Sequence, residues 1–270
     1  MKQSFWLCFL ALLVAALFIL PGVFAVVQPS GAGVTEISNQ TMAPDAAGSQ
    51  AAIAGNVTEM NLYGYTDTQA WQGYYGNVSG TIQLVDGSDN VLYNWSDANP
   101  LGQVYSSTNS TIHWLHVQCF NFTAKGTPGN ITDTGETPGL TNKKGMNLTQ
   151  LQNEFGIGAN DFDSVNNTFY LLGNSSSSVH STFYTANLEF NGSECQTSRI
   201  YDNSGTGVAG HFEEVIQYEP TTSSVIWTSI LNRNLLGFDK KQHDFEMLVP
   251  ENGHKTNTAT TTYYFYVQLQ

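Results

Sequence analysis

The feature that most constrains the fold of this chain is a period of two in its apolar residues, repeated in short segments between turns. In residues 78–84 apolar and small residues alternate with polar ones, and the turn sequence DGSD separates them from the apolar segment 91–95. A second pair of segments, 212–218 and 225–231, flanks the turn sequence PTTS. Such pairs are typical of β-hairpins. Their regular spacing predicts an all-β fold, an antiparallel β-sandwich that is immunoglobulin-like or larger.

Four further segments are expected to be strands. Residues 111–120 form an apolar run, and residues 184–190 alternate with Tyr, Ala, Leu and Phe on one face. Residues 245–249 and 263–269 alternate as well, and we expect them to pair with each other across the polar loop between them.

One short helix is predicted among the strands. Asn147 and Gln150 have the spacing of a capping box. Leu151 and Phe155 share one helical face, and Gly156 is placed to end the helix. A helix of about ten residues is marginal alone, so we expect it to pack on the sheet.

The N-terminus has the plan of a secretory signal peptide. Lys2 supplies a positive charge, and residues 5–20 are apolar and uncharged. Pro21 then breaks the segment, and Ala25 offers a small residue for cleavage. We expect residues 1–25 to be removed, which leaves no stable membrane span. The alternative is an uncleaved anchor, because the apolar segment is only slightly short for a bilayer.

The next segment predicts a flexible arm. Residues 26–55 are rich in Gly, Ala and Ser and almost free of aromatic residues, so they bury too little apolar surface to offset their chain entropy. We therefore expect residues 56–270 to form the β-sandwich domain.

The charge of the chain excludes one class of partner. It has 22 acidic and 9 basic side chains, a formal net charge of −13. Nucleic acid binding needs clustered Lys and Arg, so nucleic acid is excluded as a partner. The polarity comes mainly from Asn, Ser, Thr and Gly, as is ordinary for an exported protein.

The cysteines agree with export. Cys8 lies in the expected signal peptide, which leaves Cys119 and Cys195 in the mature chain. In an oxidising compartment these two are expected to form a disulfide, which would join both halves of the chain into one domain. Two buried free thiols are the alternative.

Acceptor sites for N-linked glycans are unusually frequent, and an acceptor that is used must lie on exposed backbone. The asparagines that begin an Asn-X-Ser/Thr triplet are Asn39, Asn56, Asn77, Asn94, Asn109, Asn121, Asn130, Asn147, Asn166, Asn174 and Asn191. The absence of acceptors beyond Asn191 predicts that the C-terminal part of the chain is either a bare face or a buried sheet.

A cluster of aromatic residues has two interpretations. Trp71, Tyr74 and Tyr75 follow Tyr63 and Tyr65 closely, and Tyr and Trp rings can stack on sugars. These residues are candidate ligand-binding residues. The alternative, which we favour, is that most of them belong to the core and that one or two rings are exposed.

No catalytic residue, metal site or cofactor is predicted. His113 and His116 lie in an apolar segment that is expected to be a strand, where their side chains would point to opposite faces. Glu213 and Glu214 are adjacent and would also face opposite ways, so they cannot act as a carboxylate pair. The loop around Asp161 lacks the pattern of a calcium loop. The chain is therefore expected not to be an enzyme. The alternative is a hydrolase whose active site is assembled from residues distant in the sequence.

Three stretches carry a resemblance to a family. WQGYYGNVSGTIQLVDGSDNVLYNW, LTQLQNEFGIGANDFDSVNNTF and DFEMLVPENGHKTNTATTTYYFYVQLQ resemble a group of exported, β-rich archaeal proteins of unknown function. The resemblance covers most of residues 56–270 and implies a glycosylated protein at the archaeal cell surface. It implies no activity, cofactor or catalytic residue.

These observations favour an extracellular structural subunit. The apolar final segment TTTYYFYVQLQ must be paired or covered, and an arm or strand exchanged between copies would cover it by strand addition. We therefore expect a homo-oligomer or polymer, as in a filament, sheath or surface layer. The alternative is an adhesin or carbohydrate-binding module that uses exposed aromatic residues.

Overall fold

A computed structural model describes residues 27–43, 45–97, 101–122, 146–173, 179–253 and 260–270. The expected signal peptide and the acceptors Asn130 and Asn174 lie outside these residues. Most elements in the described part of the chain are antiparallel strands, which confirms the all-β class.

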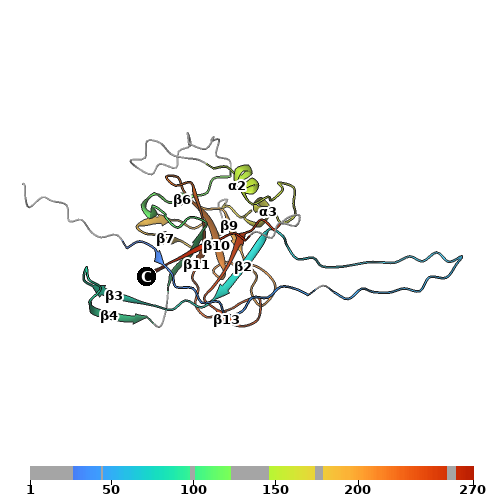
Figure 1. The fold of residues 1–270 in the computed structure, drawn as a ribbon, viewed down its shortest axis with the longest axis horizontal. Coiled ribbons are helices and arrows are strands. Elements are labelled where there is room, and N and C mark those ends of the chain that lie inside the picture. The colour runs from blue at the N-terminus through green and yellow to red at the C-terminus, as the bar shows by residue number, and fades with distance from the viewer. Residues whose placement is uncertain (1–26, 44, 98–100, 123–145, 174–178, 254–259) are drawn as a thin grey trace, which may run out of the picture.

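The elements follow in chain order (Figure 1). The strands are β1 (Ser30–Gly31), β2 (Trp71–Gly76), β3 (Gly80–Val85), β4 (Val91–Asp97), β5 (Gly102–Ser107), β6 (Gln118–Cys119), β7 (Phe183–Thr185), β8 (Leu188–Phe190), β9 (Thr197–Arg199), β10 (Glu213–Glu219), β11 (Ser224–Ile230), β12 (Leu235–Leu236), β13 (Gln242–His243), β14 (Phe245–Pro250) and β15 (Tyr264–Leu269). The helices are α2 (Leu148–Glu154), α3 (Val165–Thr168) and the 3₁₀ turn η1 (Trp114–His116).

The described strands form one seven-stranded sheet and several pairs. The order in the large sheet is β1-β15-β5-β11-β10-β6, and β9 also pairs with β10. The pairs are β14 with β2, β3 with β4, β7 with β8 and β12 with β13. The hairpins predicted from the DGSD and PTTS turns are confirmed as β3–β4 and β10–β11.

The centre of the large sheet is buried on both faces. Every residue of β10 is buried, and β11 is buried except for its half-buried last residue. Because successive side chains of a strand point to opposite faces, Ile216 and Trp227 pack in one apolar cluster while Val215 and Ile226 pack in another. The sheet is therefore the middle layer of the fold.

Helices and the β2–β14 pair cover the first face. Leu151 of α2, Phe169 after α3 and Val249 of β14 are fully buried in its cluster, or nearly so. The ring of Trp71 lies edge-on to Trp227 at a centroid distance of 5.7 Å. Burial of side chains as large as these contributes most of the apolar stabilisation of such a layer.

The predicted helix is confirmed with its capping box. Asn147 Oδ1 accepts a hydrogen bond from Gln150 N, and Gln150 Oε1 accepts one from Asn147 N, both at 2.9 Å. Gly156 follows the helix with a φ of +64°, a conformation that glycine adopts without strain. The second short helix, α3, begins at the cap residue Ser164 and was not predicted.

The β7–β8 hairpin and η1 cover the second face. Phe183 and Phe190 stack at 5.0 Å across the hairpin, and Trp114 of η1 packs on Tyr105 of β5 at 5.1 Å. The predicted disulfide between Cys119 and Cys195 is present and joins β6 to the segment before β9.

A buried polar network holds the second layer to the sheet. Gln217 Oε1 accepts hydrogen bonds from Thr228 Oγ1 at 2.8 Å and Thr185 Oγ1 at 3.2 Å. Gln268 Oε1 accepts one from Ala186 N at 2.8 Å. Because an unpaired buried amide is costly, these bonds favour one position of the hairpin on the sheet.

Three strand predictions are wrong. β14 pairs with β2 and β15 pairs with β5 and β1, so these two strands do not pair with each other. Residues 184–190 are not one strand, because Ala186 has a φ of 55° and turns the chain into a hairpin. Residues 111–120 contain η1, which places His113 and His116 side by side with ring centroids 5.8 Å apart, as residues three apart in a 3₁₀ turn are expected to lie.

The sandwich itself is not confirmed. Both faces of the large sheet are covered, but by helices and two-stranded pairs rather than by a second large sheet within the described residues. The described helices include none that is long and apolar enough to cross a membrane.

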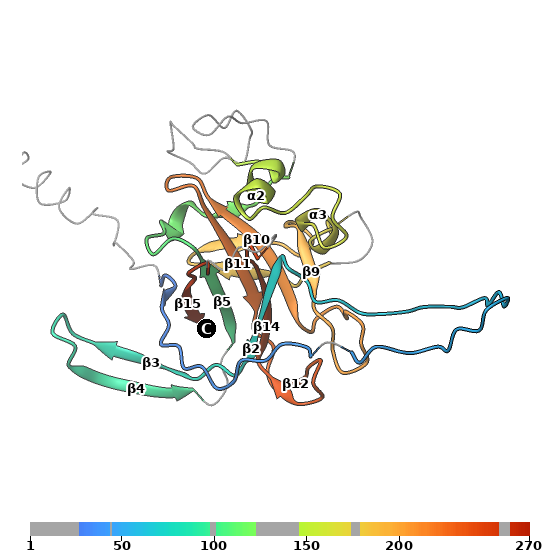
Figure 2. The same cartoon turned by 45° about the vertical axis from the view of Figure 1, so that its right-hand side comes forward.

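Two extensions leave the body (Figures 1 and 2). Every described residue from 33 to 69 is exposed, and this segment, which we call the excursion, runs out from the body and returns to β2. The β3–β4 hairpin projects in another direction. The predicted arm ends at residue 55, whereas continuous exposure ends only at the buried residue Ala70.

Replacing both bridged cysteines, Cys119→Ala with Cys195→Ala, is expected to lower the free energy of unfolding by about 4 kcal/mol, because the bridge spans 76 residues. Urea unfolding of both chains measures this. The unaltered chain with a reducing agent is the control and should match the double variant. Equal stability of the bridged chain and the variant would contradict the prediction.

Candidate functional site

The edge of the large sheet at β15 is the candidate site for assembly. On its inner side β15 pairs with β5 along its whole length, from Tyr264 opposite Ser107 to Leu269 opposite Gly102. On its outer side the strand pairing of β15 with β1 covers two residues. Most of this outer edge therefore has no strand beside it among the described residues, and an open edge can accept another strand.

The covering strand comes from the predicted arm. Ser30 lies opposite Val267 and Gly31 opposite Tyr266, and Ala32 N donates a hydrogen bond to Phe265 O at 3.0 Å. The preceding Pro29 lacks a backbone N–H, and proline is tolerated at the edge of a sheet for this reason. Nothing in the sequence alternation identifies β1, because two small residues carry no periodic signal.

Side chains of β15 anchor it in both layers. Phe265 lies edge-on to Tyr74 at 5.1 Å in the first layer. Tyr266 lies edge-on to Trp114 at 5.0 Å in the second layer, and its hydroxyl donates to Asn109 O at 3.1 Å. The position of the edge strand is therefore fixed. Its backbone N–H and C=O groups on the outer side remain available to another strand over most of their length.

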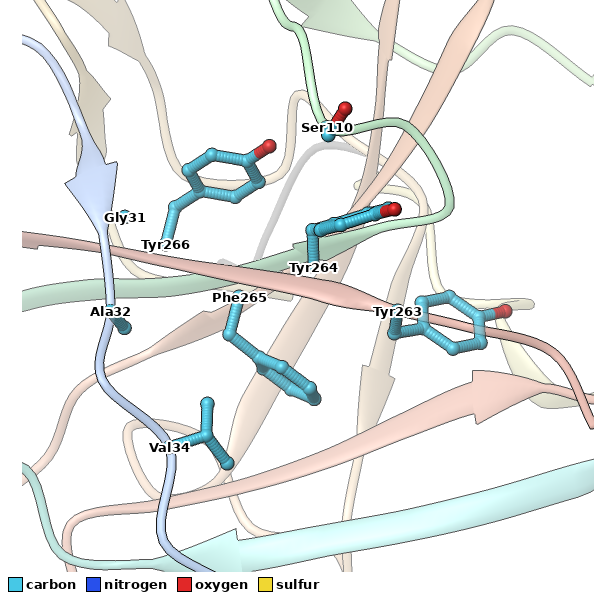
Figure 3. Close-up of a pocket in the computed structure, with 8 residues that line it drawn as sticks. All are labelled: Gly31, Ala32, Val34, Ser110, Tyr263, Tyr264, Phe265 and Tyr266. Carbon is cyan, nitrogen blue, oxygen red and sulfur yellow. The ribbon is translucent and has the colours of Figure 1, made fainter.

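A pocket of about 400 Å³ lies beside this edge (Figure 3). Its lining combines the N-terminal residues Gly31, Ala32 and Val34 with Ser110 and residues 263–266. Just before β15 the hydroxyl of Tyr263 donates to Pro250 O at 2.6 Å, and burial raises the pKa of this phenol. The pocket lies where the arm meets the edge of the sheet, and both line it. Its shape therefore depends on the position of the arm.

The aromatic candidates do not form one exposed face. Trp71 is half-buried and its Nε1 donates to Asp163 O at 2.6 Å, while half-buried Tyr74 packs on Phe265. Tyr75 is exposed and lies edge-on to Phe238 at 5.0 Å. Binding of a ligand by these residues stays a prediction, with Tyr75 as the accessible member.

Most described acceptor asparagines are accessible. Asn109 and Asn147 are half-buried, and Asn147 is also the cap of α2. The exposed acceptors are Asn39, Asn56, Asn77, Asn94, Asn121, Asn166 and Asn191. Beyond Asn191 the chain supplies the buried strands β10 and β11 and also the exposed residues Leu236 and Phe238, so both explanations for the missing acceptors stay predictions.

The adjacent carboxylates of Glu213 and Glu214 accept hydrogen bonds from backbone N–H groups. Glu213 accepts from Ser181 N at 2.8 Å and from Gly210 N at 2.7 Å, whereas Glu214 accepts from Leu248 N at 2.8 Å. The two side chains thus face opposite layers, as predicted. No group of three or more His, Cys, Asp or Glu side chains suited to a metal ion occurs in the described part of the chain.

Burial raises the pKa of Glu214 and Glu246, as it also does that of Glu154. Desolvation raises the pKa of Glu214 well above its usual value, although the bond from Leu248 N opposes this. Desolvation also raises the pKa of Glu246 to about 7, and the charges of Asp239 and Asp202 add to the effect. Both side chains are therefore held more easily as neutral acids than exposed glutamates are.

No protein-family model, curated protein or solved structure matches this chain. The interpretation of the site therefore depends on its geometry.

The substitution Glu246→Gln is expected to change stability at alkaline pH. The folded-state pKa of about 7 exceeds the ordinary value of 4.5, so this group stabilises the fold below about pH 4.5 and loses that contribution as the pH rises through 7. Glutamine stays neutral, so the variant should be more stable than the unaltered chain at pH 8.5 and nearly equal to it at pH 4.5.

Urea unfolding at the two pH values measures this difference. Glu59→Gln, on the exposed excursion, is the matched control and should change neither value. A Glu246→Gln chain with the same pH dependence as the unaltered one would contradict the prediction.

Proposed function

We propose that this chain is a non-enzymatic, extracellular surface glycoprotein that assembles as a structural subunit of a filament, sheath or surface layer. The observation that carries the proposal is the pairing at the β15 edge, where a strand of two residues from the N-terminal arm covers a long edge strand. The archaeal resemblance and the exposed acceptor asparagines support a cell-surface setting.

The arm is suited to exchange between copies. β1 and Ala32 contribute few backbone hydrogen bonds, each with a net value of roughly 1 kcal/mol. The same segment of a second copy can form the same bonds on β15, and it gains the affinity of strand addition. Exchange therefore costs little in contacts while it joins two subunits.

Deletion of residues 26–55 is expected to abolish polymers and to leave the domain folded, because it removes β1 but none of the buried sheet. Electron microscopy and sedimentation velocity report the assembly, and circular dichroism reports the fold. Deletion of residues 45–54 is the matched control, since it shortens the excursion and keeps β1. Assemblies that survive the first deletion unchanged would show that arm exchange is wrong.

The alternative, an adhesin or carbohydrate-binding module, is favoured by one observation, the exposed ring of Tyr75. Trp71 cannot be its probe, because Trp71→Ala removes contacts with Trp227 and Phe169 and is expected to cost about 3 kcal/mol of stability. Tyr75→Ala should leave the fold intact. Glycan-array binding that disappears in this variant would support the alternative, and absence of binding to any glycan counts against it.

A further inference from the structure

The β3–β4 hairpin is an amphipathic element without a partner in the described structure. Its two strands pair with each other and with no other described strand, and the hairpin projects from the body (Figures 1 and 2). Isolated two-stranded hairpins are marginally stable in water. A free hairpin of this kind is therefore expected to gain stability from a covering surface.

The two faces of the hairpin differ. Ile82 lies opposite Trp95 and Leu84 opposite Tyr93, so these four side chains share one face. They are between 42% and 58% exposed, and the rings of Tyr93 and Trp95 lie 4.7 Å apart. We call this the apolar hairpin face. A contiguous apolar face of this kind on a surface marks an interaction site.

The opposite face is polar. Thr81 and Gln83 lie on it, and Gln83 lies opposite Asn94, the acceptor of the triplet Asn94-Trp95-Ser96. A glycan on Asn94 would therefore extend away from the apolar hairpin face and leave it accessible. Val85, Val91 and Leu92 are also exposed, but they lie where the register of the two strands shifts, so we assign them to neither face.

The charge of the hairpin argues against a lipid surface as its partner. Its tip carries Asp86 and Asp89, and the sequence has no Lys or Arg from residue 3 to residue 124. Segments that lie on anionic membranes rely on Lys and Arg beside their apolar residues. A partner that fits the hairpin would instead offer an apolar surface beside positive charge.

This chain carries such a surface at β12 and β13. Tyr75, Leu236 and Phe238 are exposed there, and the ring of Tyr75 lies edge-on to Phe238. Lys240 and Lys241 follow after Asp239 and are exposed. We call Tyr75, Leu236, Phe238, Lys240 and Lys241 the end patch. Because Lys241 forms an ion pair with Asp239 at 3.7 Å, the patch offers mainly the charge of Lys240 to the acidic tip of the hairpin, and both surfaces are apolar.

We propose that the apolar hairpin face of one copy packs on the end patch of a second copy of this chain. The tip of the hairpin points away from β12 and β13 in both views, so the contact suits a neighbour rather than the same copy (Figures 1 and 2). A contact between two different surfaces repeats from copy to copy, so it adds a second link between subunits that the exchanged arms already join. The inference rests on the proposed structural function and names a contact distinct from the arm and β15.

Variants of each surface test the contact by sedimentation velocity. The hairpin variant is Ile82→Ser with Trp95→Ser, and the patch variant is Phe238→Ser with Lys240→Glu. Each is expected to weaken association at least 30-fold, because aromatic anchor residues supply most of the binding free energy of an interface and these substitutions remove them. Gln83→Ser, on the polar side of the same hairpin, is the matched control and should change association less than about threefold. An equal loss in this control would overturn the assignment to the apolar face.

A mixture of the two variants distinguishes this contact from a hairpin-to-hairpin contact. The patch variant keeps an intact hairpin, and the hairpin variant keeps an intact patch. An equimolar mixture should therefore associate more strongly than either variant does alone, because it restores one hairpin-to-patch contact for each pair of copies. A mixture that associates no more strongly than the separate variants would overturn the pairing of hairpin with end patch.

The unaltered chain gives a test that does not depend on the folding of any variant. Trp95 is exposed, whereas Trp71 is half-buried and Trp114 and Trp227 are buried, so acrylamide quenching of the folded mature chain reports mainly on Trp95. We expect quenching to fall at least twofold when the chain assembles.

Failure of this inference and failure of the proposed function give different results. Assembly with unchanged quenching and a fully associating hairpin variant would overturn the hairpin contact and leave the structural function standing. A chain that remains monomeric at every concentration would overturn both.

Discussion

The burial of β10 and β11 on both faces organises this fold. With Ile216 and Trp227 in one cluster and Val215 and Ile226 in the other, these strands cannot be exposed to water without losing two cores at once. The layers on either side consist of short helices and two-stranded pairs. Contacts such as the Cys119–Cys195 bridge and the hydrogen bonds of the buried glutamines attach them to the sheet. The sheet therefore fixes where the elements that cover its two faces can lie.

A fold built this way has a well-protected centre and an open periphery. β10 and β11 have neighbours on both sides, whereas β15 has a covering strand of two residues. The β3–β4 hairpin and the excursion lie outside the layers altogether. A monomer that only had to be stable would gain by covering these segments. Their exposure is consistent with a subunit that is completed by its neighbours.

Local signals in the sequence predicted local structure well. The turn sequences of the β3–β4 and β10–β11 hairpins, the capping box at Asn147 and the cysteine pair each identified a feature that the structure contains. In each case the residues that carry the signal are also the residues that make the contact. Prediction and structure agree at these places because the residues that determine each feature lie in one short segment or form a single covalent pair.

Pairing between distant segments could not be predicted. WQGYYG in β2 lacks the alternation of a strand, so its pairing with β14 is set by packing of Trp71 on the first layer. Ala186 turns the chain with a φ of 55°, which the alternation of its neighbours does not reveal. The candidate site depends on β1, whose two small residues become a strand only because β15 lies beside them. Its geometry is a product of the tertiary fold.

The most direct test of assembly through open edges is electron microscopy of the native protein released gently from its source cells. We expect regular polymers in which one subunit repeats along the axis and glycan density lies outside the contacts. Single, dispersed molecules at the concentration found on the cell surface would contradict it.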